Sequence, residues 1–204
     1  MTIPIRKPGK LSSVVKSYRP IRLLSVLAKI LERVIKSRLH DHLTASNIVP
    51  EVQFGFHRGH STTHQVLRVV KDIRDGSQRG ESTGMVLLDL TCAFDTVWHS
   101  ELLHKMSQTH LSIHLIKIIK SCLTDRSFYV RVNHTKSSPR DIPAEAPQGS
   151  ALSPDLFNIF TYGIPQELGN KVGVFADNSA IWYTAKRAAS VWKAVQTGCD
   201  SYTR

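Results

Sequence analysis

The chain has 204 residues, of which 41% are hydrophobic, so it can bury a sizeable core as one large domain or two small ones. No stretch approaches the eighteen or more apolar residues that a membrane span needs, and the N-terminus lacks the apolar core of a signal peptide. We therefore expect an intracellular protein of the cytoplasm, the nucleus or both, without a membrane partner.

The charge of the chain is strongly positive. There are 27 Lys and Arg against 16 Asp and Glu, giving a formal net charge of +11 and a pI near 9.8. This balance favours polyanions, chiefly nucleic acid, although a basic pI separates nucleic-acid binders poorly from proteins that bind anionic membranes. The three cysteines are widely spaced and form no disulfide framework or Cys-x-x-Cys zinc pair, so we expect no disulfide-linked partner.

The first half of the chain predicts two helices and a strand. After a basic opening marked by Pro and Gly, apolar residues recur at helical spacing over 23–35, with basic residues between them. A Gly-rich segment, 53–63, leads into a second helical pattern over 66–73. A polar connection, 76–84, then precedes an apolar run that ends at Asp89.

The second half continues the mixture of helices and strands. Helical patterns cover 98–106 and 115–123, and a strand pattern covers 128–132. Ser, Pro and Asp at 153–155 form a strong helix start, and 186–204 predicts a last helix. The order of these elements predicts an α+β fold in which a sheet carries helices on one face.

Two apolar segments carry acidic residues at unusual places. One ends at Asp89, and the other, 172–183, is interrupted by Asp177 and Asn178. If both are strands, burying two unpaired carboxylates would be costly, which suggests that they share a divalent cation. The alternative has no chemistry in it, because Asp-Asn is also a good dipeptide for a hairpin turn.

The ten histidines include two pairs with a spacing that suits a metal site. His60 and His64, and likewise His110 and His114, are four residues apart and would share a helix face. No His-Glu-x-x-His pattern occurs and no cysteine stands nearby. Solvated helix histidines are therefore the better interpretation.

Five short blocks stand in a specific order along nearly the whole chain. They are Ser17-Tyr18-Arg19-Pro20-Ile21, Gln53-Phe54-Gly55-Phe56, Leu88-Asp89-Leu90 with Ala93-Phe94-Asp95, Pro147-Gln148-Gly149-Ser150, and Phe175-Ala176-Asp177. In these blocks the chain resembles the reverse transcriptase domain of non-LTR retrotransposons, close to the Jockey-like mobile elements of arthropods. The resemblance implies a right-hand polymerase fold, with a fingers-like part in 1–80 and a palm in 81–204. The palm would be an antiparallel sheet backed by helices, and the thumb would be absent.

The resemblance also implies an activity and its metal ligands. An RNA-directed DNA polymerase transfers a nucleotide from a dNTP to the 3′-hydroxyl of a DNA primer on an RNA template. Asp89 and Asp177 match the residues that hold two Mg²⁺ ions, for which Mn²⁺ can substitute, and Asn178 lies beside them in the catalytic hairpin. One ion lowers the pKa of the primer hydroxyl, and both stabilise charge on the transferred phosphate.

Other positions match the family's contacts to nucleotide and nucleic acid. Phe94 stands where the family has an aromatic gate against the ribose 2′-hydroxyl, with an ordinary core phenylalanine as the alternative. Gln148 and Gly149 match a loop that supports template and incoming nucleotide, although Pro-Gln-Gly alone would be only a turn. Basic residues of the fingers match phosphate contacts: Arg19, Lys29, Arg58 and Arg68. Taken singly each is a solvated charge, but together they predict salt-sensitive binding.

The chain also departs from the family's pattern. Asn178 replaces the second aspartate of Ala-Asp-Asp, His57 stands where an arginine is usual, and Glu145 adds a carboxylate near the expected path of the nucleic-acid backbone. We therefore expect a truncated, partly decayed copy with weak or no activity, because the sequence ends soon after the catalytic hairpin. Two alternatives are a non-catalytic nucleic-acid-binding remnant and a product that never folds stably.

Overall fold

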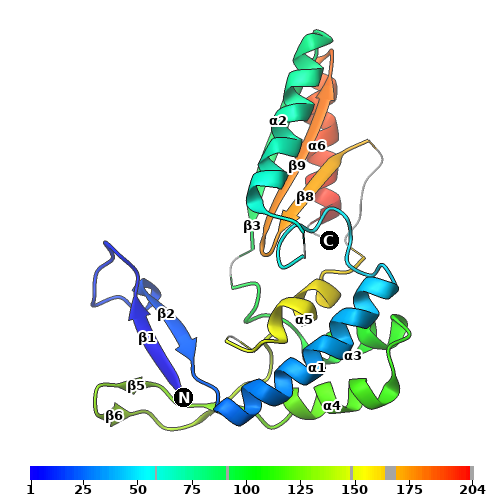
Figure 1. The fold of residues 1–204 in the computed structure, drawn as a ribbon. Coiled ribbons are helices and arrows are strands. Elements are labelled where there is room, and N and C mark those ends of the chain that lie inside the picture. The colour runs from blue at the N-terminus through cyan, green and yellow to red at the C-terminus, as the bar shows by residue number, and fades with distance from the viewer. Residues whose placement is uncertain (58, 91, 148, 164–168, 203–204) are drawn as a thin grey trace. The chain divides into compact units, whose positions relative to one another are not determined.

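The computed structural model describes residues 1–204 apart from 58, 91, 148, 164–168 and 203–204. The chain forms two compact units, which interleave along the sequence (Figure 1). Unit 1 comprises Met1–Ser46 and Phe94–Phe160, and unit 2 comprises Asn47–Ala93 and Thr161–Arg204. The expected fingers and palm parts divide the chain differently, at residue 80, and stay a prediction. Across the described residues, no helix has both the length and the apolar character that a bilayer crossing requires.

Unit 2 is built on a three-stranded antiparallel sheet. Its elements are α2 (Thr62–Gln78), β3 (Ser82–Asp89), β8 (Lys171–Phe175), β9 (Asn178–Ala185) and α6 (Ala188–Tyr202). The strand order is β3-β9-β8, so β9, the last of the three strands in the sequence, is the central strand. The predicted strand that ends at Asp89 and the predicted C-terminal helix are both confirmed.

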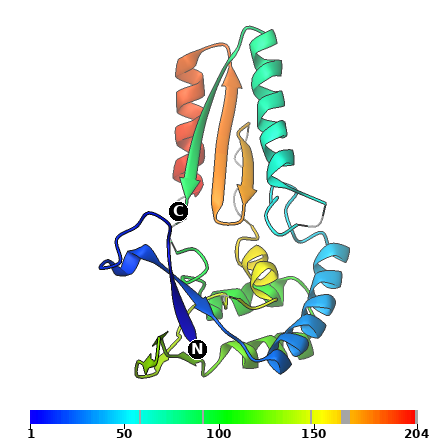
Figure 2. The ribbon, with the colours of Figure 1, turned by 60° about the vertical axis from the view of Figure 1, so that its left-hand side comes forward.

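Helices cover both faces of this sheet, and Figure 2 shows the strands lying between α2 and α6. Trp182 of β9 is fully buried, and its Nε1 donates a hydrogen bond of 3.0 Å to Asp72 of α2. Neighbouring residues of a strand point to opposite faces, so Tyr183 points away from α2. Its cross-strand partner, Gly84 of β3, lies against Val191 of α6. The expectation of helices on one face is therefore wrong for this sheet. Its physical reason is the unbroken apolar run at 85–88, which supplies apolar side chains to both faces.

Among the described residues, unit 1 combines four α-helices and one 3-10 helix with short strands. Its elements are β1 (Thr2–Arg6), the 3-10 helix η1 (Val15–Ser17), β2 (Tyr18–Arg22), α1 (Val26–Ala45), α3 (His99–Gln108), α4 (Ile113–Leu123), β4 (Ser127–Phe128), β5 (Arg131–Val132), β6 (Thr135–Lys136), β7 (Arg140–Asp141) and α5 (Ser153–Phe160). Most of the large, fully buried side chains of the unit come from its four α-helices and include Leu39, Leu43, Leu102, Met106, Ile119, Leu123, Leu156 and Ile159. The helix starts predicted near 98, 115 and 153 are confirmed within two residues.

The short strands of unit 1 form hairpins that the sequence pattern predicted only in part. β1 and β2 pair with Pro4 opposite Pro20, which is tolerated because each strand of a two-stranded sheet is an edge strand. The strand predicted over 128–132 is divided into β4 and β5. A turn at Asn133 and His134 follows, since β5 pairs with β6 and Asn133 has a φ of +53°.

The first predicted helix forms, but only part of its apolar face is buried. Ser25 caps α1 by accepting a hydrogen bond from the backbone N–H of Ala28, and Ile35, Leu39 and Leu43 are buried farther along. The apolar residues of the first turns are instead exposed: Val26, Leu27, Ile30, Leu31 and Val34. The helical spacing of the apolar residues thus predicted the helix correctly. The buried residues, however, are confined to its second half.

The histidine pairs do not share helix faces. His60 precedes α2, which contains His64, and His110 precedes α4, which contains His114. In the part of the chain that the structure describes, no group of three or more His, Cys, Asp or Glu side chains is arranged to hold a metal ion. The interpretation of these histidines as a metal site therefore receives no support.

Candidate metal and nucleotide site

The hairpin between β8 and β9 carries the second acidic position. Its turn consists of Ala176 and Asp177, and Ala176 has a φ of +58°. Asn178 is the first residue of β9, where it pairs with Phe175 on one side. The predicted Asp-Asn turn is thus wrong by one residue, because the register of the hairpin places Asn178 in the ladder.

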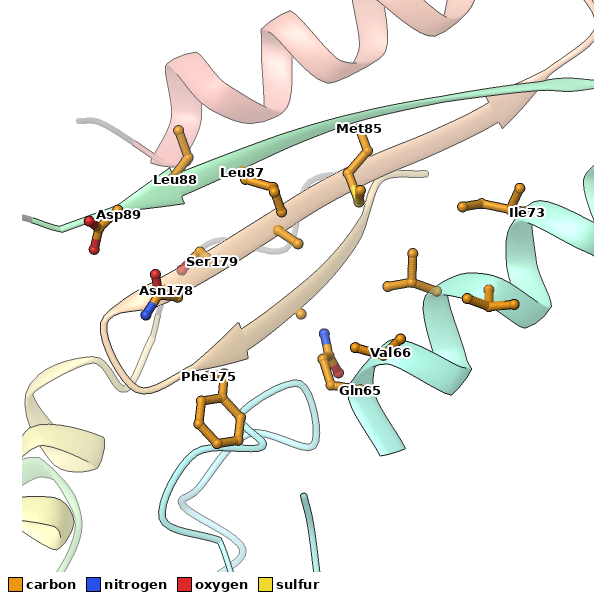
Figure 3. A pocket seen from close by; sticks show the side chains of 14 residues that line it. Gln65, Val66, Ile73, Met85, Leu87, Leu88, Asp89, Phe175, Asn178 and Ser179 are labelled. Carbon is orange, nitrogen blue, oxygen red and sulfur yellow. The ribbon is translucent and has the colours of Figure 1, made fainter. Parts of the chain in front are cut away.

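The sheet register brings Asp89 to this hairpin, although the two lie far apart in the sequence. Asp89, the last residue of β3, lies directly opposite Asn178, and such pairs place their Cβ atoms roughly 4.5–5.5 Å apart. The backbone N–H of Leu90 donates to the carbonyl oxygen of Asp177 at 3.1 Å. The Asn178 amide donates to Oδ1 of Asp177 at 3.2 Å. Figure 3 shows Asp89 and Asn178 at the same end of the sheet, where β3 ends and β9 begins.

The expected burial of these carboxylates is not observed. Asp89 and Asn178 are exposed, and Asp177 is half-buried. Both acids lie where the backbone leaves the sheet, at a strand end and in a turn, so water reaches them. A desolvation penalty therefore does not demand a shared cation, and what favours a metal site is the register that brings both acids to one end of the sheet.

The residues present fit a magnesium ion. Mg²⁺ takes oxygen ligands and is commonly held by one or two carboxylates together with substrate phosphates and water. Asp89 and Asp177 supply two carboxylates at one end of the sheet, and the Asn178 side chain adds a neutral oxygen. A neutral amide lowers the negative charge of the site, so metal affinity should depend strongly on this position.

A buried glutamine positions the hairpin, which sequence reasoning missed. Oε1 of Gln53 accepts hydrogen bonds from the backbone N–H groups of Gly55 at 2.9 Å and Ala176 at 3.2 Å. The backbone of Phe54 also pairs with Val174 of β8 at 2.7 Å. A Cβ atom on Gly55 would lie 2.2 Å from the backbone nitrogen of Ala176, so only glycine fits there. The Gln-Phe-Gly block thus clamps the turn that carries Asp177.

Arg68 has a structural role within unit 2. Its guanidinium lies 5.5 Å from the ring of Trp182 and 6.0 Å from that of Phe54, and it donates to the carbonyl oxygen of Val172 at 3.3 Å. The guanidinium is therefore engaged within the unit. A phosphate contact by this residue remains a prediction, for which these bonds would have to be exchanged.

Beside Arg68, Asp72 connects α2 to the sheet through both carboxylate oxygens. One accepts from Lys171 at 2.5 Å and the other from Trp182 at 3.0 Å. Burial alone would raise the pKa of Asp72, but the hydrogen bonds from Lys171 and Trp182 outweigh it and leave the pKa lowered. This carboxylate is thus a structural anion, distinct from the acids of the hairpin.

An apolar groove adjoins the acidic end of the sheet. It has a volume of about 580 Å³ and lies between α2 and the sheet face that carries Asp89. Val66 and Ile73 line it from the helix, and Met85 and Leu87 line it from β3 (Figure 3). Leu87 is 72% exposed, so the groove is open. The carboxylate of Asp89 therefore has water on one side and an apolar wall on the other.

The nucleotide-pocket residues of the sequence analysis belong to unit 1. The ring of Phe94 stacks on the ring of Phe157, with the two centroids 4.4 Å apart. This packing within unit 1 is that of a core phenylalanine. Gly149 has a φ of +78°, and a Cβ there would lie 2.8 Å from the carbonyl oxygen of Arg22. Glycine is thus required in this loop by the backbone of β2. Gln148 lies outside the described residues.

Glu145 is buried in an ion cluster rather than facing a nucleic acid. Its side chain is 1% exposed and forms salt bridges with Arg22 and, at 3.2 Å, with Arg126. The interpretation that it stands in the path of the backbone is therefore wrong. The backbone N–H of Glu145 donates to Nε2 of His99 at 3.2 Å, and burial followed by the charge of Arg126 lowers the pKa of His99. The cluster fixes the segment that leads into the Pro147 loop.

The remaining basic candidates are only partly described. Arg19 on β2 and Lys29 on α1 are exposed, as a phosphate ligand must be. Arg58 lies outside the described residues. Their contacts to nucleic acid remain predictions.

With this geometry in hand, the chain can be compared with known proteins. The family described as "Reverse transcriptase (RNA-dependent DNA polymerase)" matches residues 5–203. The "Probable RNA-directed DNA polymerase from transposon BS" of Drosophila melanogaster is 44% identical over 161 residues, which are 79% of this chain and 18% of the relative. The "RNA-directed DNA polymerase from mobile element jockey" of the same organism is 35% identical over 98% of this chain and 23% of the relative. The chain belongs to the reverse transcriptase family. The prediction of a reverse transcriptase domain from a non-LTR retrotransposon is confirmed.

Solved structures support the fold. The apo telomerase of Candida tropicalis, truncated from its C-terminal domain, is similar with a TM-score of 0.59 and 12% identity over 89% of this chain and 44% of that chain. The telomerase of Candida albicans, solved with a TWJ fragment of telomeric RNA, has a TM-score of 0.55 and 12% identity over 95% and 41%. The predicted α+β fold is thereby confirmed. The chain spans about a fifth of the length of the curated relatives it matches.

Proposed function

We propose that the chain is the part of an RNA-directed DNA polymerase that carries the metal-binding sheet. The observation that supports this best is the register that joins Asp89 to the Asp177 hairpin in a member of the reverse transcriptase family. In this proposal the sheet of unit 2 is the palm, with α2 and α6 on its two faces. The fingers lie in the N-terminal part, and the substrates are an RNA template, a DNA primer and a dNTP.

Asp89 and Asp177 would hold the Mg²⁺ ions, or Mn²⁺ in their place. When bound, such ions stabilise charge on the attacking oxygen, the transferred phosphate and the leaving pyrophosphate. The protein's own contribution is position. Gln53 fixes Ala176, the ladder fixes Asp89, and the bond from Asn178 orients one oxygen of Asp177.

Residues of unit 1 complete the proposed assignment. Gly149 allows the loop after Pro147 to approach the backbone of β2 closely, and this loop with Gln148 would support the incoming nucleotide. Phe94, whose ring stacks on Phe157, would oppose a ribose 2′-hydroxyl. We also propose that the protein acts in the cytoplasm, the nucleus or both.

A second candidate function is non-catalytic binding of nucleic acid. Asn178 favours it, because the site carries one carboxylate fewer than the family's Ala-Asp-Asp pattern supplies. The net charge of +11 is retained, so affinity for a polyanion does not depend on the metal residues.

Primer extension separates the two candidates. The assay uses poly(rA) with an oligo(dT) primer in Mg²⁺ or Mn²⁺, and compares this chain with the Asn178→Asp and Asp89→Ala variants. If Asn178→Asp gains extension that Asp89→Ala lacks, the polymerase proposal is supported. If all three bind template, unfold cooperatively on heating and extend nothing, binding without catalysis is the function. A chain without a cooperative transition would instead be unfolded.

A further inference from the structure

The positive charge of the chain is concentrated in two segments of unit 1. Residues 1–22 contain six Lys and Arg and no Asp or Glu, and residues 126–140 contain four Lys and Arg and again no acid. The units differ accordingly, since unit 1 has 17 basic and 8 acidic residues whereas unit 2 has 10 and 8. These two segments are about a fifth of the chain and carry most of its net charge. Such clustering of basic residues is typical of a surface that binds a polyanion.

The fold brings these two segments together although more than a hundred positions separate them. The backbone N–H of Thr2 donates to the carbonyl oxygen of Tyr129 at 2.8 Å, and Thr2 forms a parallel bridge with Val130. The N–H of Ser137 in turn donates to Val130 at 2.9 Å. The β1–β2 hairpin and the β5–β6 hairpin are thereby joined side by side (Figures 1 and 2). We call this surface, formed by residues 1–22 and 126–140, the basic hairpin pair.

The charges of this surface are available to a ligand. Its exposed basic side chains are Arg6, Lys10, Lys16, Arg19, Arg131, Lys136 and Arg140. None of them forms a salt bridge with any residue that the structure describes. Arg22 and Arg126 differ, because they share the buried carboxylate of Glu145. Arg22 and Arg126 therefore have a carboxylate partner, while the exposed basic side chains have no acidic partner among the described residues.

Aromatic rings accompany these charges. Tyr18 lies at the start of β2 and Tyr129 lies between β4 and β5, and both are half-buried. The ammonium group of Lys136 lies 5.6 Å from the ring centroid of Tyr129. Proteins that bind single strands combine a basic track for phosphates with aromatic faces for bases.

We propose that the basic hairpin pair is a binding surface for single-stranded RNA, with Arg131, Lys136 and Arg140 as phosphate contacts beside those of β1 and β2. The class of partner follows the proposed function, but the surface lies on unit 1 and contains none of the metal residues of unit 2. Binding at this surface therefore needs neither a metal ion nor a dNTP.

The test measures fluorescence anisotropy of a labelled single-stranded RNA of mixed sequence with the full chain, without metal or dNTP. One variant carries Arg131→Gln, Lys136→Gln and Arg140→Gln. The matched control removes three exposed charges from unit 2, with Lys186→Gln, Arg187→Gln and Lys193→Gln. We expect the hairpin variant to lose roughly tenfold in affinity near physiological salt. Its slope of log affinity against log salt should fall by about 2, since each phosphate contact on a single strand contributes about 0.7.

The outcomes are distinguishable. A hairpin variant that loses affinity and slope well beyond the control supports the proposal. Equal losses in both variants would show binding by net charge alone and overturn it. Sedimentation with vesicles of phosphatidylcholine and phosphatidylserine adds another arm, because a hairpin variant that loses vesicle binding but keeps RNA binding would assign the surface to membranes. Failure of primer extension affects none of these readouts, and circular dichroism confirms that each variant is folded.

Discussion

Asp89 lies directly opposite Asn178 across the ladder between β3 and β9. The position at which the chain departs from the family's Ala-Asp-Asp pattern is therefore the cross-strand neighbour of the first proposed metal ligand. The Asn178 amide also donates a hydrogen bond to Asp177, which a carboxylate at this position could not do. One side chain thus sets both the charge of the site and the orientation of its second ligand.

Replacing Asn178 by Asp should strengthen divalent metal binding. A third carboxylate within about 5 Å of a bound ion adds roughly 1–2 kcal/mol of attraction at a solvent-exposed site, or about a tenfold gain in affinity. Titration with Mn²⁺, followed by electron paramagnetic resonance, measures the free ion. Asn133→Asp in the exposed β5–β6 turn is the matched control and should leave the affinity unchanged. Equal gains in both variants would contradict a metal site at Asp89 and Asp177.

Gly55→Ala should destabilise the protein more than an alanine at a glycine in open space. The added Cβ would lie 2.2 Å from the backbone nitrogen of Ala176, and backbone atoms yield less readily than a flexible side chain. Overpacking typically costs about 1–3 kcal/mol, and we expect the upper end of this range where backbone atoms must shift. The control is Gly59→Ala, where an added Cβ would meet no described atom within 4 Å beyond its chain neighbours, and where only the positive φ costs about 1–2 kcal/mol. Urea denaturation compares the two, and equal losses would show that Gly55 is not packed against the hairpin.

Glu145→Gln should also be strongly destabilising. It would leave the charges of Arg22 and Arg126 without their buried counterion, and breaking a buried ion pair costs about 3–5 kcal/mol. Glu81→Gln, which removes a partially exposed pair with Arg79, should cost about 1 kcal/mol or less. Chemical denaturation measures both changes. If the buried substitution is as mild as the other, Glu145 does not hold the cluster together.

His99 should make the protein less stable in mild acid. Burial, followed by the charge of Arg126, lowers the pKa of His99 below its usual value of about 6.5. The folded state then binds fewer protons than the unfolded state, so this contribution is complete above about pH 6.5 and is lost as the pH falls through the folded pKa. The melting temperature of a His99→Gln variant should therefore change less between pH 7.5 and 5 than that of the parent. A variant whose melting temperature falls as steeply would count against this role.

The sequence predicted the parts of the fold that depend on local periodicity. The helices near 99, 113, 153 and 188 and the strand that ends at Asp89 follow from apolar spacing and helix-start residues. β1 and β2 were missed because Pro4 and Pro20 argue against strands, and only the structure shows that they pair as edge strands. Burial was the weakest prediction, since the first turns of α1 are exposed although their spacing is that of a buried face.

The proposed metal ligands could be predicted from the sequence, but the contacts that hold the site in place could not. Asp89 and Asp177 could be chosen as a pair from the apolar runs that carry them, and the register brings them to one end of the sheet. The support from Gln53 was invisible, because a buried glutamine that bonds to backbone N–H groups leaves no periodic signal. The environment of Glu145 could not be inferred either, since its two arginine partners are far from it in the sequence.

The interleaving of the two units constrains how the protein can be made. The first 46 residues leave the ribosome early, but the rest of unit 1 starts at Phe94, so its core is incomplete until Phe160 has been synthesised. Residues 47–93 wait in the same way for the strands and the helix that follow Thr161. Contacts between distant parts of a chain slow folding. During synthesis, each half-built unit must therefore keep its apolar surface from aggregating until its second segment arrives.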